Sequence, residues 1–234
     1  MTDLYRSSEV TLITTDGSRS ETGAVLLNEH ELRIIVNEQS VMKLICTGQH
    51  LNELVTGRLL TSGFIESAED INKILFNEHK TEACVFLNND IDPDTVKNRR
   101  VLRTLPAPDY KHEWIFAMAK QFEKGTRLHD MTSCTHSCML ARCGKILFTC
   151  EDIGRHNAMD KAIGYGLSSG IPLSECILYT SGRIPVDMAE KSIAAGVAVL
   201  ASKSIPTADA VDLAKKYGLV IIGNARPDSM KLFT

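Results

Sequence analysis

The sequence predicts an α/β fold in which a mostly parallel sheet, covered by helices, follows a smaller α+β part. Strand-like and helix-like segments alternate from residue 175 to residue 223, and such alternation requires crossover connections between parallel strands. The first hundred residues instead contain short β-rich runs separated by turn residues. With 44% apolar and 24% charged residues, the chain of 234 residues is long enough to bury a substantial core.

The N-terminal part should contain short strands, a helix and a linker. Apolar residues at helical spacing predict a helix over 50–60, and the capping box Ser67–Asp70 predicts the start of a second helix. The polar stretch 88–100 predicts a turn or linker. We place the domain boundary between residues 103 and 110, which gives parts 1–105 and 106–234. Four β-rich runs predict strands, the first three in a small antiparallel sheet: 10–14, 23–27, 32–36 and 80–87.

The C-terminal part should alternate strand and helix. A helix is expected over 111–124, and a buried strand over 143–150 leads into a polar segment. Thr207 is a typical N-cap and Gly218 a typical C-cap, so they bound the last helix. The remaining elements follow in the order strand, helix, strand, helix and strand: 175–180, 187–195, 197–202, 207–217 and 219–223.

The composition excludes several classes of protein. No apolar run reaches the roughly 18 residues that a membrane span requires. The N-terminus MTDLYRSSEV lacks the basic and apolar regions of a signal peptide, so we expect a cytoplasmic protein with no membrane segment. The formal net charge of -3 argues against a nucleic-acid-binding protein. Seven cysteines in such a chain predict free thiols.

The segment EDIGRHNAMDK, residues 151–161, holds six ionisable side chains in eleven residues. On a helix, Asp152, His156 and Asp160 would share one face, and Glu151 and Arg155 would form a second pair. One interpretation is a polar wall that contacts a ligand. The other is the start of a helix with Asp152 as its N-cap and with solvated salt bridges. The candidate ligand contacts here are Asp152, Arg155, His156, Asn157, Asp160 and Lys161.

Three predicted strand ends carry residues suited to a ligand: Glu151 onward, Ser181 to Arg183, and Asn224 to Arg226. In open α/β sheets the carboxyl ends of strands form the ligand crevice, so we expect these ends to face one crevice. Arg155, Arg183 and Arg226 together suit a phosphorylated or nucleotide-bearing ligand. Taken singly, each arginine is more typical of a solvated surface than of a ligand site.

Cysteines crowd the segment before the polar motif. Cys134 and Cys138, beside His136, are candidate nucleophiles or sulfur carriers, with burial as small apolar residues the equal alternative. Their spacing does not form the paired C-x-x-C of a zinc site, and we predict no metal site. His136 and His156 are candidate proton donors or ligand contacts. Four cysteines in or beside apolar runs are predicted to be buried: Cys84, Cys143, Cys150 and Cys176.

EDIGRHNAMDK, TSCTHSC and residues 181–226 resemble the formate dehydrogenase accessory proteins of the FdhD family, and CTGQHLNELVTGRLLTSGFIESAEDI resembles that family's helix pair. The resemblance implies a cytidine-deaminase-like mixed sheet and a homodimeric sulfurtransferase. Such a protein passes persulfide sulfur from a cysteine desulfurase to the molybdenum bis(molybdopterin guanine dinucleotide) cofactor that formate dehydrogenase requires. The family's T-G-G-x-H-A segment corresponds to the stretch from Thr132 through His136. The family's cofactor-binding position corresponds to Asn224, Ala225, Arg226, Pro227, Asp228 and Ser229, of which Ala225 and Arg226 match well.

Two departures from the family pattern change the expected mechanism. The two glycines before the histidine are Ser133 and Cys134 here, and the small residue two places after it is Cys138. The persulfide loop of C-G-x-C-G type is replaced by RRVLRTLPAPDY, and no cysteine lies between Cys84 and Cys134.

These departures leave two interpretations. Either Cys134 and Cys138 carry the sulfur, or the chain binds a guanine-dinucleotide or other phosphate-bearing cofactor without transferring sulfur. A zinc-dependent deaminase is a third alternative, but Ser137 and Cys138 follow His136 where H-x-E is required, and no C-x-x-C comes later.

Overall fold

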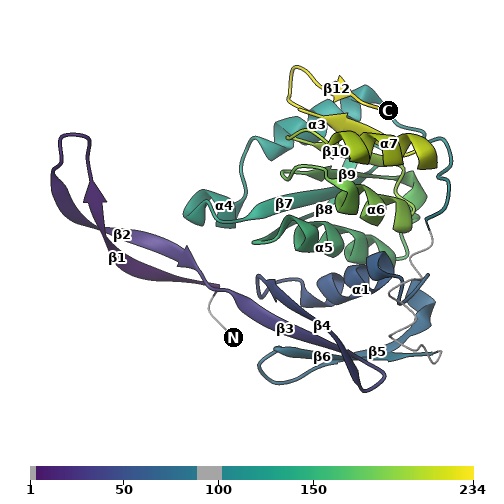
Figure 1. The fold of residues 1–234 in the computed structure, drawn as a ribbon, viewed down its shortest axis with the longest axis horizontal. Coiled ribbons are helices and arrows are strands. Elements are labelled where there is room, and N and C mark those ends of the chain that lie inside the picture. Colours follow the sequence, from purple (N-terminus) through teal and green to yellow (C-terminus); the bar gives the residue numbers. More distant parts are fainter. Residues whose placement is uncertain (1–3, 89–101) are drawn as a thin grey trace.

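The computed structural model describes residues 4–88 and 102–234, whose strands form three sheets (Figure 1). A six-stranded sheet has the order β12-β11-β10-β9-β7-β8, and a four-stranded sheet has the order β4-β3-β6-β5. The remaining strands, β1 and β2, form a hairpin. The fold is mixed α/β, as the sequence predicts. None of the helices in the described ranges has the length and apolar character needed to cross a membrane.

The six-stranded sheet is parallel at its centre and antiparallel toward its edges. The strands β9, β10 and β11 are parallel, which confirms the predicted alternation. The others pair antiparallel with their neighbours. Short connections join β7 to β8 and β11 to β12, as antiparallel pairing allows. The strands are β7 (His136–Arg142), β8 (Lys145–Asp152), β9 (Cys176–Thr180), β10 (Val199–Ser202), β11 (Val220–Gly223) and β12 (Lys231–Leu232).

Helices cover both faces of this sheet (Figure 1). On one face, α5 (Arg155–Ser168), α6 (Val186–Ala194) and α7 (Ala208–Tyr217) enclose a core that includes Leu140. On the other face, Ile115 and Met118 of α3 (His112–Phe122) share a core with Met139. Successive strand residues point to opposite faces, so both Met139 and Leu140 are buried.

The four-stranded sheet differs from the small antiparallel sheet that the sequence predicts. β3 (His30–Val36) pairs parallel with β6 (Glu82–Leu87), and β1 (Tyr5–Ile13) and β2 (Arg19–Leu27) form a separate hairpin. Pairing between segments about fifty residues apart leaves no trace in local sequence patterns. The second predicted helix is a single 3₁₀ turn, Ala68–Asp70, although Ser67 and Asp70 do form the predicted capping box. The other two strands are β4 (Gln39–Cys46) and β5 (Ile71–Phe76).

The helix α1 (Leu51–Ser62) packs directly on α5 and joins the two sheets into one structure. A β-carbon on Gly57 would lie 1.9 Å from the carbonyl oxygen of Asp160, and one on Gly164 would lie 1.9 Å from that of Glu53. Only glycine permits such close backbones. The resulting core contains residues from both sides of the domain boundary that we predict near residue 105. The boundary itself stays a prediction. Apart from Asn88, the predicted linker 88–100 lies outside the described residues.

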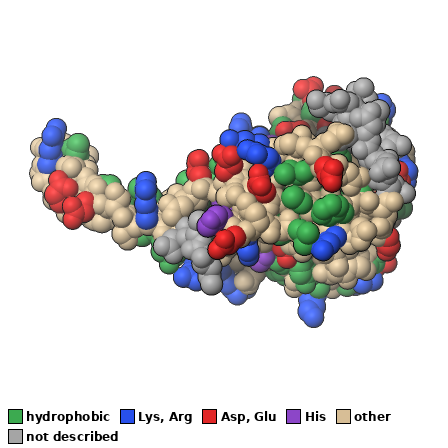
Figure 2. All heavy atoms as spheres, turned by 90° about the horizontal axis from the view of Figure 1, so that it is seen from below, with side chains coloured by type: hydrophobic (Ala, Val, Ile, Leu, Met, Phe, Trp, Pro, Cys, Tyr) green, Lys and Arg blue, Asp and Glu red, His purple; other side chains and the backbone are tan. Residues whose placement is uncertain are grey.

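The hairpin of β1 and β2 projects away from the rest of the protein (Figures 1 and 2). Val10, Leu12 and Leu26 on it are exposed. Figure 2 also shows hydrophobic side chains gathered on the underside of the body. Exposed hydrophobic side chains of the four-stranded sheet include Leu75 and Phe86.

Most predicted elements of the C-terminal part are confirmed within about two residues. The predicted caps of α7 are also confirmed, because Thr207 Oγ1 accepts a hydrogen bond from the Ala210 N–H and Gly218 has a φ of 76°. The strand expected over 143–150 begins at Lys145, because Cys143 and Gly144 form the turn before it with positive φ. Elements that the sequence did not reveal include β4, β5, β7, β12 and the helix α4 (Arg127–Thr132).

Candidate functional site

A cavity of about 740 Å³ lies at the carboxyl ends of β9, β10 and β11. Ser181, Ser204 and Arg226 follow these strands and line the cavity. The prediction that the strand ends face one crevice is therefore confirmed for Ser181 and Arg226. Arg183 is exposed and does not line the cavity. The volume falls in the range of about 300–1,000 Å³ typical of small-molecule sites.

His136, the first residue of β7, lies in the wall of this cavity. Its Nδ1 is 3.1 Å from the hydroxyl oxygen of Ser181, which also accepts a hydrogen bond from the Ser137 N–H. Burial lowers the pKa of His136, and the neighbouring Arg155 and His129 lower it further. The imidazole is therefore neutral at pH 7, with one nitrogen that donates and one that accepts.

Arg155 adds a positive charge beside the cavity. Its side chain packs against Gly182, where a β-carbon would lie 2.9 Å from Arg155 Cβ. The Arg155 Nε atom is buried without a hydrogen-bond partner among the described residues. Such a donor is normally satisfied by an ordered water or a ligand. Lys203 and Arg226 add two positive charges to the cavity wall, which also carries the carboxylates of Glu123 and Asp130.

Cys134 is exposed and lines the cavity, whereas Cys138 is completely buried. Cys134 follows α4, and its N–H donates to Thr132 Oγ1 at 3.2 Å. Burial raises the pKa of the Cys138 thiol well above its ordinary value. A thiolate nucleophile at Cys138 is thus excluded in this conformation, and the alternative of a small buried residue is correct.

The other cysteines follow the predicted pattern with one clear exception. Cys150 and Cys176 are buried, as expected, and Cys84 is half-buried. Cys143 was predicted to be buried, but the turn before β8 exposes it. It lies at the opposite end of β7 from the cavity, so it is a second accessible thiol outside the site.

Three candidate ligand contacts of the polar motif are instead buried inside the protein: Asp152, Asp160 and Lys161 have no exposed surface. Lys161 Nζ lies 2.6 Å from Asp152 Oδ2 and donates to Thr47 Oγ1 at 2.6 Å. Asp160 pairs with Lys191 at 2.6 Å. These contacts fasten α5 to neighbouring elements, and they assign the three residues to fold support.

The helical stacking that we predict for this motif is wrong for Glu151 and Asp152, whereas His156 and Asp160 do lie one turn apart on α5. The helix α5 begins only at Arg155, so Glu151 and Asp152 lie on β8. The N-cap is Gly154, whose N–H donates to Asp152 Oδ1 at 3.0 Å. A strand that ends inside the motif therefore separates residues that a continuous helix would align.

Asn157 and His156 also make internal contacts and do not line the cavity. The buried Asn157 amide donates to the carbonyl oxygen of Ile45 at 2.8 Å and to Asp152 Oδ1 at 3.0 Å. His156 Nε2 lies 3.2 Å from Asp187 Oδ2. Burial lowers the pKa of His156, an effect that the carboxylate of Asp187 partly opposes.

The loop after β11 contributes one side chain to the cavity. Arg226 lines it, and the Arg226 N–H donates to the Ser229 carbonyl oxygen at 2.7 Å. Ala225 is buried and its carbonyl oxygen accepts a hydrogen bond from the Tyr179 hydroxyl. The other predicted contacts in this loop do not line the cavity: Asn224, Pro227, Asp228 and Ser229.

Several cavity residues have no signal in the sequence. His129 and Lys203 belong to none of the motifs that the sequence analysis singles out, and only the folded chain brings them to the cavity. Ser181 was recognised only as part of a strand end. Within the described ranges, no group of three or more His, Cys, Asp or Glu side chains is placed to hold a metal ion.

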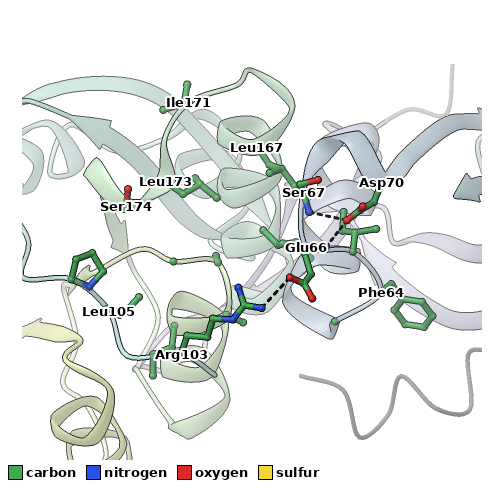
Figure 3. A pocket seen from close by; sticks show the side chains of 18 of the residues that line it. Phe64, Glu66, Ser67, Asp70, Arg103, Leu105, Leu167, Ile171, Leu173 and Ser174 are labelled. Atoms are coloured by element: carbon green, nitrogen blue, oxygen red, sulfur yellow. Dashed lines mark hydrogen bonds and ion pairs between the residues drawn. The ribbon is translucent and has the colours of Figure 1, made fainter. Parts of the chain in front are cut away.

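A second cavity of about 860 Å³ lies between the end of α1 and the ends of α5 and α6 (Figure 3). Leu167 and Leu173 line it, and an ion pair between Arg103 and Glu66 lies at its edge. It contains none of the predicted site residues and no thiol. We therefore place the functional site at the smaller cavity.

Comparison with known proteins identifies the family of this chain. The model of the FdhD/NarQ family matches residues 27–108 and 92–234. A sulfur carrier protein FdhD from Methanothermobacter thermautotrophicus is 30% identical over 99% of this chain and 97% of its own length. One from Mycolicibacterium paratuberculosis is 32% identical over 89% of each chain.

A solved structure is similar along nearly the whole chain. The crystal structure of a formate dehydrogenase accessory protein from Desulfotalea psychrophila has a TM-score of 0.85 and 25% identity, and the match covers 99% of this chain and 97% of that one. The chain belongs to the FdhD/NarQ family.

Proposed function

We propose that this chain is a sulfur carrier that matures formate dehydrogenase. It takes persulfide sulfur from a cysteine desulfurase and delivers it to the molybdenum bis(molybdopterin guanine dinucleotide) cofactor. The observation that carries this proposal is the exposed Cys134 thiol in the wall of the same cavity as His136 and Arg226. The relatives named sulfur carrier protein FdhD support it.

The loading step is a thiol exchange at Cys134. The Cys134 thiolate attacks the terminal sulfur of the desulfurase persulfide, a new S–S bond forms on Cys134, and the desulfurase cysteine leaves as a thiolate. Such a step requires an accessible thiol. Cys134 meets that requirement and the buried Cys138 does not.

The cavity suits the phosphate groups of the client cofactor. Arg226 and Lys203 supply positive charge in its wall, and Arg155 lies beside it. Guanidinium groups bind phosphate oxygens in a fork geometry. The neutral His136 and the hydroxyl groups of Ser181 and Ser204 add hydrogen-bonding capacity, so a phosphate-bearing cofactor is held next to the sulfur.

Three further features follow from the family resemblance. We propose a cytidine-deaminase-like sheet, a cytoplasmic location and a homodimer. The exposed Val10, Leu12 and Leu26 of the projecting hairpin support a partner surface, because an isolated two-stranded hairpin is only marginally stable in water. Sedimentation equilibrium of the full chain tests the dimer.

Intact-mass spectrometry after incubation with a cysteine desulfurase and cysteine tests the carrier role. We expect a gain of one sulfur atom in the wild type and in Cys143→Ala, which removes the exposed thiol outside the site. Cys134→Ala should gain none. A wild type that takes up no sulfur, or a gain that persists in Cys134→Ala, contradicts the proposal.

The second candidate is a binder of the cofactor that performs no sulfur chemistry. The absence of any cysteine between Cys84 and Cys134, where the family's persulfide loop is expected, favours it. Calorimetry with GDP separates the two candidates when combined with the mass measurement. Binding that is lost in Arg226→Ala, without sulfur uptake by the wild type, identifies a binder.

A further inference from the structure

The carboxylate of Glu151, near the end of β8, accepts four hydrogen bonds from one short segment. Its Oε1 accepts from Thr126 Oγ1 at 2.7 Å, from the His129 N–H at 2.8 Å and from Thr135 Oγ1 at 2.9 Å. Its Oε2 accepts from the Leu128 N–H at 3.0 Å. Thr126 precedes α4 and Thr135 follows Cys134, so one side chain holds both ends of the segment that carries the thiol.

This segment has little stability of its own. The helix α4 has six residues, and helices this short are unstable in isolation. Its N-cap, Thr126, makes no side-chain capping bond, and Glu151 satisfies the Leu128 and His129 N–H groups that the helix leaves unpaired. The position of Cys134 therefore depends on a residue from another element.

The same contacts connect the segment to the cavity wall. Thr126 Oγ1 lies 3.0 Å from Ser137 Oγ. The Ser137 N–H donates to Ser181 Oγ, which is the atom beside His136 Nδ1. Within the segment, His129 Nδ1 lies 2.9 Å from the Thr135 carbonyl oxygen. Hydrogen bonds through Ser137 and Ser181 thus connect the segment that carries Cys134 with His136.

We infer that Glu151 is a positioning residue that acts through segment 126–135 and fixes the Cys134 thiol at the cavity. The consequence for sulfur delivery rests on the proposed function, whereas the structural effect does not. The substitution Glu151→Gln keeps the side-chain volume but turns one acceptor oxygen into a donor. The new amide NH₂ group then faces groups that donate to the carboxylate in the wild type, so the four hydrogen bonds of Glu151 cannot all remain.

Hydrogen exchange followed by mass spectrometry tests the structural effect. In Glu151→Gln we expect exchange of the Leu128 and His129 amides to accelerate about tenfold or more, with α5 and α6 unchanged. Glu151→Asp keeps both acceptor oxygens and should give a smaller increase. Glu66→Gln, which alters only an exposed ion pair with Arg103, is the matched control and should leave this segment unchanged. Equal exchange in wild type and Glu151→Gln overturns the inference.

Labelled sulfur tests the functional effect by separating two steps. Loading of the exposed Cys134 should change by no more than about twofold in Glu151→Gln, whereas delivery to the cofactor should fall about tenfold or more, because a misplaced reacting group loses much of its rate. Glu151→Asp should restore part of the delivery. Equal losses in both steps would contradict a positioning role. If the wild type takes up no sulfur, the proposed function fails, and the exchange measurement still decides the role of Glu151.

Discussion

Glu151 and Asp152 are neighbours on β8, yet they belong to two different polar regions. Successive side chains of a strand point to opposite faces. Glu151 points to segment 126–135 at the cavity edge, and Asp152 points into the interior, where it meets Lys161 and Thr47. One region holds an exposed thiol and a neutral histidine next to solvent. In the other, Thr47, Asp152 and Lys161 have no exposed surface.

The comparison teaches that density of charge in a sequence does not by itself identify a ligand site. The inner region, which consists of Asp152, Asp160 and their buried partners, joins distant parts of the chain. The Thr47 N–H donates to Asp152, and Lys191 Nζ donates to Asp160. In the outer region, at the cavity edge, the single carboxylate of Glu151 holds the first turn of α4. Which task a residue performs is set by the face of the strand or helix on which it lies.

The largest effect should come from unpairing a charge in the inner region. Lys161→Met removes the partner of Asp152, and an uncompensated buried charge costs about 3–5 kcal/mol. Urea unfolding followed by circular dichroism measures this loss. In the double variant Lys161→Met/Asp152→Asn we expect a smaller loss than in Lys161→Met alone, because no charge is left unpaired. A loss in Lys161→Met no larger than that of an exposed pair, about 0–1 kcal/mol, would show that the inner region is not sealed from water.

Local sequence patterns predict the elements of the C-terminal part well and the pairing of elements poorly. The alternation of strands and helices, together with caps such as Thr207 and Gly218, is encoded within a few residues. The parallel pairing of Arg33 with Glu82, and the bond between Thr47 and Asp152, join residues far apart in the chain. No local periodicity reports such contacts.

In the candidate site, too, the sequence identified some residues correctly and could not identify others. Strand ends and residue chemistry identified Cys134, His136 and Arg226, all of which line the cavity. The same reasoning also selected Cys138 and Asp160, which are buried in the structure. The residue type alone does not show whether a polar or reactive side chain is buried. The roles of Glu151 and His129 depend on α4, whose six residues are too few for a recognisable periodicity.

An intermediate effect is expected where α1 crosses α5, the contact on which the inner region depends. Gly57→Ala places a β-carbon 1.9 Å from the Asp160 carbonyl oxygen, so the helices must separate. Overpacking of this kind costs about 1–3 kcal/mol, which urea unfolding should show. Gly23→Ala is the control, because a β-carbon there meets no atom within 4 Å. Equal stability of the two variants would mean that the helix contact is loose.

The smallest effect should come from the pair of His156 and Asp187, which lies nearer the solvent. Asp187→Asn removes the charge of a half-exposed carboxylate, and exposed pairs of this kind contribute only about 0–1 kcal/mol. Stability at pH 7 should therefore change little. This result would sharpen the contrast with Lys161→Met, since that variant unpairs a fully buried carboxylate, whereas the contact of His156 with Asp187 is partly exposed.

The pH dependence of this variant is more informative than its stability at pH 7. Burial lowers the pKa of His156 in the folded protein, so between the folded and unfolded pKa values the unfolded chain binds more protons, and stability falls as the pH drops. Asp187 raises this pKa, so Asp187→Asn should lower it further and extend the acid destabilisation to lower pH. An NMR titration of the His156 ring in both proteins measures the shift. A higher pKa in the variant would mean that Asp187 does not stabilise the protonated ring and that its contact with His156 is unimportant in solution.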